Sequence, residues 1–389
     1  MKVVFFSRFP GNINEPCGGV ESATVNLAKA LSRMSDVDLH VVTFEKDIKQ
    51  VEVINEENIT IHRLPGSRTF QIIDILAGPG HFYLKKYLKH LDPDIIHFHE
   101  TYGLGVGKLN APYVFTVHGF DSENIPVESG RLGRFSWLRS PLWKLVEFEG
   151  LKRQKHIISI TPYVKKHIKT LTHANIYDID NAISSIFFDT PHKPIKGRIF
   201  SVGWISHRKN TLGIIKAFSR LMGASSIDAS LYIAGERKNP EYAKKVDKEI
   251  KKSNIENKIR FLGKLSQEEI REELSCADIF VLPSYQENAP MAIAEAMAAG
   301  VPVVTSNRCG MPYMIDEGKT GFLVDPDDIE ALADRMRILL TDVELRSKIG
   351  EAARHLAKER FHPDSVAQKT KKVYEEILKK ADESINCKR

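Results

Sequence analysis

The sequence contains little cysteine, and its four residues of this type are scattered. Cys17, Cys276, Cys309 and Cys387 form no C-x-x-C pair. Closely spaced cysteines are typical of structural zinc sites and of disulfide-stabilised secreted domains. We therefore expect a chain that works in a reducing, cytoplasmic compartment and has no structural metal ion.

Long apolar runs are also missing. No segment approaches the ~18–20 apolar residues that are needed to cross a bilayer. The apolar start at residues 2–6 is too short for the h-region of a signal peptide, so it predicts a first buried strand. With 42% hydrophobic and 27% charged residues, the composition is that of a soluble globular protein.

The formal net charge of +6 is modest, but its distribution is uneven. Residues 131–169 contain ten Lys or Arg and only two acids, Glu147 and Glu149, mixed with Trp, Leu and Phe. A helix with an apolar core face and a solvated basic face accounts for this pattern. A helix lying on an anionic membrane, at its inner face, is the alternative. Nucleic acid is not expected, because no binding motif accompanies the charge.

Short apolar runs alternate with amphipathic segments, which indicates β-α units and parallel sheets. Strands are predicted near 2–6, 38–43, 59–63, 94–98, 112–117, 156–160, 176–180, 198–203, 229–234, 258–262, 278–282, 301–305 and 321–324. Helices are predicted near 20–34, 79–90, 140–153, 162–171, 209–222, 240–253, 266–275, 290–299, 327–340, 343–358 and 363–381.

The chain of 389 residues is too long for one ordinary core. Residues 189–197 contain Pro, Lys and Gly and are typical of a linker. We therefore predict an α/β protein with two doubly wound, Rossmann-like domains, 1–190 and 191–362. The carboxyl ends of their strands are expected to face a central cleft, where a ligand would bind.

The segment from Glu287 to Glu295 is the most informative in the sequence. It follows the predicted strand 278–282 and places one carboxylate on a loop and a second on the next helix, which Pro290 opens. The amides at a helix N-terminus suit a phosphate, and carboxylates accept hydrogen bonds from sugar hydroxyls. Together they point to a nucleotide-sugar.

Three other positions are candidates for the same ligand. Gly18-Gly19 precedes the first helix, where glycine lets the backbone approach a phosphate, although any turn can use this pair. His118 ends a strand, where it could bind a sugar hydroxyl or have only a structural role. Arg208-Lys209 follows strand 198–203 and could neutralise a diphosphate, or could be a solvated pair.

Metal binding is not expected. Asp-x-Asp triplets begin at Asp36, Asp92, Asp178 and Asp325, but each lies at a strand entry or a turn, where aspartate bends or caps the backbone. His97 and His99 share one face of a strand. They are interpreted as buried, hydrogen-bonded residues, and a position facing the cleft is the alternative for one of them. With His118 they form no zinc motif.

Taken together, these residues resemble the retaining glycosyltransferases of family 4, which have the GT-B fold. The resemblance covers nearly the whole chain. Its signature is the E-x7-E element from Glu287 to Glu295, which continues through 296–304. Supporting matches are Gly18-Gly19, residues 116–119, Arg208-Lys209 and residues 318–324. The final segment, 363–389, is similar to the helix that crosses back to the N-terminal domain.

The resemblance implies a role for each candidate. Glu287 would contact hydroxyls of the donor sugar and Glu295 the ribose, while His118 would lie near the transferred sugar. Arg208, Lys209 and the Gly18-Gly19 loop would flank the diphosphate. The main chain after Glu287, at Asn288, Ala289 and Pro290, would also contact the diphosphate, although Pro290 has no N–H. Leu265 would contact the base through its main chain.

The sequence departs from the family pattern at two places. Gly203 is followed by Trp204, where many members have an arginine, and Arg208 beside Lys209 is expected to take over phosphate binding. Asn-Ala-Pro follows Glu287 in place of Gly-Phe-Gly, which is expected to affect the choice of sugar.

The resemblance implies a retaining, metal-independent sugar transferase without a cofactor. A UDP-, GDP- or ADP-sugar would be the donor, and a carbohydrate or a lipid-linked molecule the acceptor. Two alternatives stay open: a nucleotide-sugar epimerase on the same architecture, and a non-catalytic protein that binds a nucleotide-sugar. Conversion of the donor without an acceptor would indicate the first, and binding without turnover the second.

Overall fold

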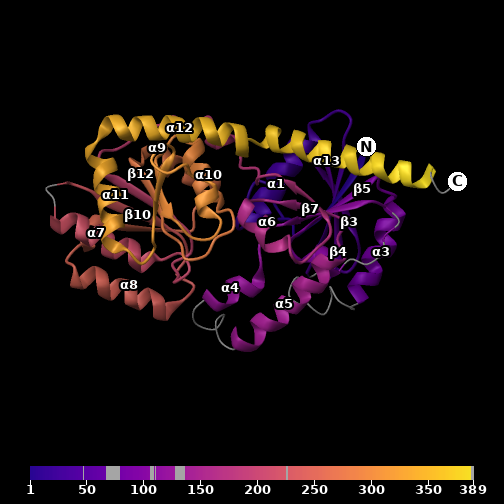
Figure 1. The fold of residues 1–389 in the computed structure, drawn as a ribbon, viewed down its shortest axis with the longest axis horizontal. Helices are drawn as coiled ribbons and strands as arrows, with labels where there is room; N and C mark the ends of the chain where they lie inside the picture. The colour runs from indigo at the N-terminus through magenta and orange to yellow at the C-terminus, as the bar shows by residue number, and fades with distance from the viewer. Residues whose placement is uncertain are drawn as a thin grey trace. The chain divides into compact units, whose positions relative to one another are not determined.

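A computed structural model describes residues 1–46, 48–66, 79–105, 109, 111–127, 136–224 and 227–386. The chain forms two compact units, each with its own sheet and its own hydrophobic core (Figure 1). Unit 1 comprises Met1–Phe120, Leu142–Ala182 and Pro363–Arg389. Unit 2 comprises Asp121–Pro141 and Ile183–His362.

Unit 1 contains an eight-stranded sheet in the order β3-β4-β2-β1-β5-β6-β7-β8. All neighbouring strands are parallel except β3 and β4. Its inner strands are almost continuously apolar because both faces of a parallel sheet are covered. The strands are β1 (Lys2–Phe6), β2 (Asp38–Glu45), β3 (Glu52–Glu56), β4 (Ile59–Pro65), β5 (Ile95–His99), β6 (Tyr113–Val117), β7 (His156–Ser159) and β8 (Asn175–Asp178).

Helices cover this sheet. They are α1 (Gly19–Ser32), α3 (Pro79–Leu91), α5 (Ser136–Lys152, of which the part from Leu142 belongs to unit 1), α6 (Pro162–Ile168) and α13 (Pro363–Asn386). Helix α13 lies beside α1 (Figure 1), and its buried side chains Val366, Ala367, Val373, Tyr374 and Ile377 belong to the core of unit 1. Helix α13 therefore contributes to the same hydrophobic core as α1 and β1.

Unit 2 contains a six-stranded, fully parallel sheet in the order β11-β10-β9-β12-β13-β14. Its strands are β9 (Arg198–Val202), β10 (Ser230–Ala234), β11 (Ile259–Gly263), β12 (Ile279–Leu282), β13 (Val303–Ser306) and β14 (Gly321–Val324). Its helices are α4 (Asp121–Val127), α7 (Thr211–Ala224), α8 (Pro240–Lys252), α9 (Gln267–Cys276), α10 (Met291–Ala298), α11 (Ile329–Thr341) and α12 (Val343–Phe361).

Both sheets have a point where the strand order reverses, and ligands of open α/β sheets bind beyond the carboxyl ends of the strands at such a point. In unit 1 it lies between β1 and β5, and in unit 2 between β9 and β12. Arg208 and Lys209 follow β9, and Glu287 follows β12. The topology of unit 2 thus brings these residues to one edge of the sheet.

The predicted α/β elements are confirmed, but strand β3 and helix α4 were not predicted. Strand β3 is antiparallel to β4, and Glu57 and Asn58 connect the two with φ of 49° and 63°. Positive φ at both central residues is typical of a type I′ hairpin turn, so this pair was the overlooked signal. Unit 1 also ends at Ala182, before the predicted boundary at 190, because the Ile183 N–H donates to the Phe361 carbonyl 3.1 Å away in unit 2.

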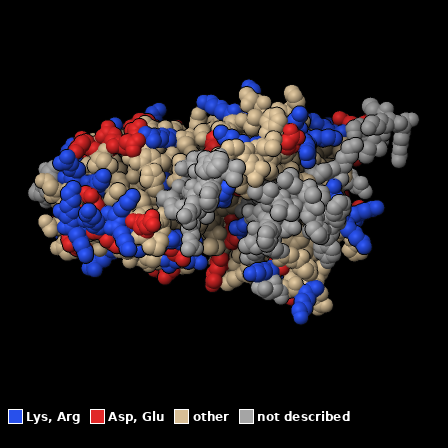
Figure 2. Space-filling view, turned by 90° about the horizontal axis from the view of Figure 1, so that it is seen from below, with Lys and Arg blue, Asp and Glu red and all other residues tan. Residues whose placement is uncertain are grey.

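Positive charge gathers on α8 of unit 2. Five of its side chains are exposed lysines, Lys244, Lys245, Lys248, Lys251 and Lys252. At 3.6 residues per turn, their positions fall within an arc of about 120°. Figure 2 shows Lys and Arg side chains clustered at the end of the molecule that carries α8. The apolar side chains of this helix, including Val246 and Ile250, are buried against unit 2.

Candidate functional site

The predicted site residues are divided between the two units. Unit 2 contains Arg208, Lys209, Leu265, Glu287, Asn288, Ala289, Pro290 and Glu295, and unit 1 contains Gly18, Gly19 and His118. Cys387 and the side chains at 131–138 of the basic stretch lie outside the described residues.

The loop after β12 positions Glu287. The Gly310 N–H donates to the Glu287 carbonyl at 2.9 Å, which ties this loop to the segment after β13. A Cβ atom on Gly310 would lie 1.7 Å from the Asn288 carbonyl oxygen, so only glycine permits the backbones to approach this closely. The Glu287 loop is therefore held by main-chain contacts that do not depend on a ligand.

Glu287 meets both predicted cations. Its Oε1 atom lies 2.8 Å from Arg208 Nη1 and 2.5 Å from Lys209 Nζ. The side chains are 12%, 17% and 16% exposed, so this is a largely buried cluster rather than a solvated pair. The Tyr285 N–H donates to the Arg208 carbonyl at 2.8 Å and joins the two loops through their backbones.

Electrostatics keep Glu287 ionised. Burial is the largest single influence and favours the neutral acid, but Lys209 and Arg208 together outweigh it and hold the pKa of Glu287 below its ordinary value. Two cations thus converge on a single oxygen of one carboxylate.

Glu295 differs from Glu287 in its surroundings. It lies on α10, is 7% exposed, and has no ion-pair partner among the residues that the structure describes. Burial alone raises its pKa to about 7. A carboxyl group in this state gains most from a ligand that donates hydrogen bonds to it.

The start of α10 also has capacity for a ligand. The helix begins at Met291, one residue later than predicted, because Pro290 has extended backbone angles and is the N-cap. Pro290 supplies no side-chain cap. The Ile293 N–H donates to the Pro290 carbonyl at 3.1 Å, so only the earlier amides of the first turn could serve a ligand. Nearby, the Asn288 Oδ1 atom is buried and has no hydrogen-bond partner among the residues that the structure describes. Such an orphaned acceptor is expected to be satisfied when a ligand binds.

Trp204 occupies the position where the family pattern has an arginine. It is 42% exposed, and the Lys238 ammonium group lies 4.0 Å from the centre of its ring. A positive charge is thus still present beside this position, held by a cation–π contact. Leu265 lies in the loop between β11 and α9, which is at the carboxyl edge of the same sheet.

In unit 1, Gly18 is the N-cap of α1, with a φ of +92° that favours glycine. Gly18 and Gly19 are exposed, and open space surrounds the position of a Cβ atom on Gly18. The Ser22 N–H donates to the Gly18 carbonyl at 3.1 Å. The turn therefore presents backbone at a helix N-terminus, where the Cys17 N–H donates to the Glu21 carboxylate at 2.9 Å.

His118 follows β6 and is partly buried, with its Nδ1 atom inaccessible to solvent. Burial lowers its pKa to about 4, while the neighbouring Asn181 side chain acts in the opposite direction. The imidazole is therefore neutral at pH 7. Its Nε2 atom lies 3.1 Å from His99 Nδ1, a contact that sequence reasoning did not predict.

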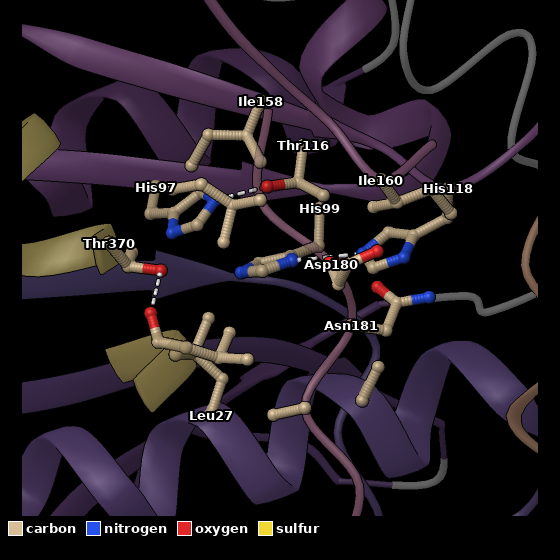
Figure 3. A pocket seen from close by; sticks show the side chains of 14 residues that line it. Leu27, His97, His99, Thr116, His118, Ile158, Ile160, Asp180, Asn181 and Thr370 are labelled. Atoms are coloured by element: carbon tan, nitrogen blue, oxygen red, sulfur yellow. Dashed lines mark hydrogen bonds between the residues drawn. The ribbon is translucent and has the colours of Figure 1, made fainter. Parts of the chain in front are cut away.

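A small cavity of about 20 Å³ lies beside these histidines within unit 1. His97, His99, His118 and Thr116 line one side, and residues of α1 and α13 line the other. Figure 3 shows His118 and Asn181 at one end of the cavity, Thr370 at the other and His99 between them.

Two family models match the chain one after the other. Residues 17–184 match the model "Glycosyltransferase Family 4", and residues 183–356 match "Glycosyl transferases group 1". The chain belongs to the group 1 glycosyltransferases of family 4. The predicted family is thereby confirmed, since the two matches cover the greater part of both units.

Individual relatives of this glycosyltransferase are distant. It is 31% identical to N-acetyl-alpha-D-glucosaminyl L-malate synthase of Bacillus anthracis over 171 residues, which is 44% of this chain and 43% of that protein. Its structure is similar to that of sucrose-phosphate synthase from Thermosynechococcus elongatus, with a TM-score of 0.79, 18% identity and coverage of 97% and 99%.

A second structure, Anabaena HepE in complex with UDP-glucose, aligns with a TM-score of 0.72 and 16% identity. The alignment covers 97% of this chain and 100% of that one. These likenesses confirm the GT-B fold class. In the part of the glycosyltransferase that the structure describes, no helix is long and apolar enough to cross a membrane, and no three His, Cys, Asp or Glu side chains are grouped to hold a metal ion.

Proposed function

We propose that this protein transfers a sugar from a nucleotide-diphosphate sugar to a carbohydrate or lipid-linked acceptor, with retention of configuration and without a metal ion. The observation that carries the proposal is the buried cluster of Glu287, Arg208 and Lys209. A carboxylate that can accept hydrogen bonds from sugar hydroxyls lies there directly beside two cations that can neutralise a diphosphate.

Each group of the cluster has a distinct task in this proposal. Arg208 and Lys209 neutralise the diphosphate and the negative charge that grows on it as it leaves. Glu287 orients the sugar through hydrogen bonds that its carboxylate accepts from sugar hydroxyls, and Glu295 accepts hydrogen bonds from the ribose. Asn288 Oδ1, buried without a partner, marks a further contact for the donor.

The reaction follows from the family likeness. The bond between the anomeric carbon and the leaving phosphate oxygen breaks, and the acceptor oxygen bonds to the same face of the sugar. The acceptor proton passes to the leaving phosphate, so that no enzyme carboxylate has to act as nucleophile. Two cations on the phosphate supply the charge neutralisation that other enzymes obtain from a divalent ion.

A UDP-sugar is the donor that we favour, because HepE, a structural neighbour of this chain, is bound to UDP-glucose. Thermal unfolding with UDP, GDP and ADP tests this choice. A ligand at 100 times its Kd stabilises the protein by about 2.7 kcal/mol. Stabilisation by GDP alone or by ADP alone would mean that the donor carries that nucleotide instead of UDP. Stabilisation by none of the three would contradict a nucleotide-sugar site.

Product analysis then tests the reaction. The protein, a UDP-sugar and carbohydrate or lipid-linked acceptors should yield free UDP and a product whose anomeric configuration, measured by NMR, matches that of the donor. Inversion of configuration would contradict the retaining mechanism. Conversion of the sugar without any acceptor would indicate an epimerase, and binding without any conversion would indicate a non-catalytic protein.

Helix α5 supports a peripheral contact with an anionic membrane, and hence a lipid-linked acceptor. Leu142, Leu145 and Phe148 are 50%, 59% and 39% exposed, although they are large and apolar. Lys144 and Lys152 lie on the same exposed side of the helix. Apolar side chains bordered by lysines fit a helix that rests at the interface of anionic lipids.

A further inference from the structure

Four polar residues, His97, His99, His118 and Tyr374, form a buried chain through unit 1. The Tyr374 hydroxyl on α13 lies 2.6 Å from His97 Nδ1, and His97 Nε2 lies 2.6 Å from Thr116 Oγ1. The rings of His97 and His99 pack against each other with centroids 4.0 Å apart. His99 Nδ1 then reaches His118 Nε2 at 3.1 Å.

All three imidazoles of this chain are neutral. Burial lowers the pKa of His97 to about 3 and that of His118 to about 4, and it holds the pKa of His99 well below its ordinary value. A neutral imidazole carries one N–H and one lone pair. The short contact between His99 and His118 therefore contains a single hydrogen, which one ring donates to the other.

The tautomers of His99 and His118 are consequently coupled. If His99 Nδ1 donates, then His118 carries its own hydrogen on Nδ1 and His99 Nε2 is an acceptor. If His118 Nε2 donates instead, His118 Nδ1 is an acceptor and His99 Nε2 carries a hydrogen. The donor or acceptor character of His118 Nδ1 is thus linked to that of His99 Nε2.

The outer nitrogen of His99 faces the small cavity. Within the described part of the chain, His99 Nε2 is buried without a hydrogen-bond partner. His118 Nδ1 is also buried, and the Asn181 side chain lies beside this ring and acts on its pKa (Figure 3). The cavity volume of about 20 Å³ is enough for one water molecule, which needs roughly 10–15 Å³ by the same measure. On the side of α13, the Thr370 hydroxyl donates to the Val366 carbonyl at 2.8 Å, so its oxygen is left as an acceptor toward the cavity.

We propose that His99 is a positioning residue that fixes the ring orientation and the tautomer of His118, with one water molecule bound between His99 Nε2 and Thr370. The role of His118 in sugar transfer rests on the proposed function. The tautomer itself does not, because it is a property of the protein without substrate. Strand β5 and helix α13 thereby determine how a residue at the end of β6 meets its ligand.

Nitrogen-15 NMR of histidine-labelled protein tests this proposal at neutral pH. The wild type should show His118 as one neutral tautomer. In His99→Leu the His118 ring nitrogens should shift toward a mixture of tautomers, and kcat should fall about tenfold while KM changes less than about twofold. His99→Asn, whose amide lies near the position of Nδ1, should restore both the tautomer and most of kcat.

Thr370→Val keeps the shape of the side chain and leaves every histidine in place, so it tests the water if His99→Leu fails to fold. It should shift the His99 Nε2 signal. The proposal would be overturned if His99→Leu left both the His118 signals and kcat unchanged. It would also be overturned if Thr370→Val left the His99 signals unchanged. A wild type with mixed His118 tautomers would also overturn it. If no transfer activity is found, the NMR result still decides the positioning role, so that the two proposals fail separately.

Discussion

Glu287 Oε1 accepts hydrogen bonds from Arg208 Nη1 at 2.8 Å and from Lys209 Nζ at 2.5 Å. Arg208 and Glu287 are 79 positions apart in the sequence. The strand order of unit 2 brings them to one edge of the sheet. One carboxylate cannot neutralise two cations. We expect a bound diphosphate to contact both cations, and the first prediction below rests on this expectation.

Removal of one cation should weaken nucleotide binding. Lys209→Met keeps most of the length of the side chain but removes its charge, so the Kd for UDP should rise about tenfold to hundredfold, since hydrogen bonds to charged groups contribute roughly 1.5–3 kcal/mol. Titration calorimetry measures the change. Lys258→Met is the matched control, because Lys258 pairs with Asp228 at a more exposed place in the same unit. Equal affinities for both variants would remove Lys209 from the diphosphate site.

Glu295 should make the protein less stable as the pH rises. Its pKa is about 7 in the folded protein and near its ordinary value of 4.5 after unfolding. The folded state therefore binds more protons between these values, and stability decreases with pH across this window. The difference corresponds to on the order of 3 kcal/mol.

Thermal unfolding of Glu295→Gln tests this dependence. The stability of the variant should fall less steeply with rising pH than that of the wild type, because Glu295 no longer ionises. At pH 8 the variant should be more stable than the wild type. The matched Glu330→Gln variant changes an exposed ion pair with Arg220 and should follow the wild type at every pH. A Glu295→Gln profile parallel to that of the wild type would show that burial does not raise this pKa.

The hydroxyl of Tyr374 should contribute to the stability of unit 1. Tyr374→Phe leaves His97 Nδ1 without its partner in a fully buried position, which costs about 1–3 kcal/mol. Tyr177→Phe removes a partly exposed hydroxyl that also contacts α13, and it should cost less than about 1 kcal/mol. Urea unfolding compares the two midpoints. A larger loss in Tyr177→Phe would contradict the role assigned to the buried contact.

Helix α5 should bind anionic vesicles. The protein is expected to sediment with phosphatidylglycerol vesicles but not with phosphatidylcholine. Replacement of Leu142, Leu145 and Phe148 by serine should weaken binding at least about tenfold, since three apolar side chains no longer enter the interface. A variant of α8 with Lys245, Lys248 and Lys252 changed to glutamine should still bind. Binding that depends on α8 but not on α5 would contradict this assignment.

The sequence was sufficient for most of the fold because parallel strands and the helices between them have clear periodic patterns. Strand β3 escaped prediction for a physical reason. Its sequence, Glu-Val-Ile-Asn-Glu, is short and mostly polar, since it pairs with β4 at the edge of the sheet and only on one side. The signal was in the Glu57-Asn58 turn rather than in the strand itself.

The candidate site was predictable as a set of residues but not as a set of contacts. Motif spacing indicated Glu287, Glu295 and the Arg208-Lys209 pair, while their ion pairs depend on how β9 and β12 lie in the sheet. The contact between Tyr374 and His97 joins residues 277 positions apart, and no local pattern contains that information. Likewise, the contrast between the two glutamates arises from burial and neighbouring charge, which only the folded chain provides.

The most direct test of the account is the rate at which Glu287→Gln releases UDP from a UDP-sugar in the presence of an acceptor. The amide keeps the size of the side chain but cannot balance both cations or accept hydrogen bonds from the sugar as a carboxylate does. We predict a fall of at least about 100-fold relative to the wild type, with Glu330→Gln unchanged. Near-normal turnover by a folded Glu287→Gln protein would contradict the central claim.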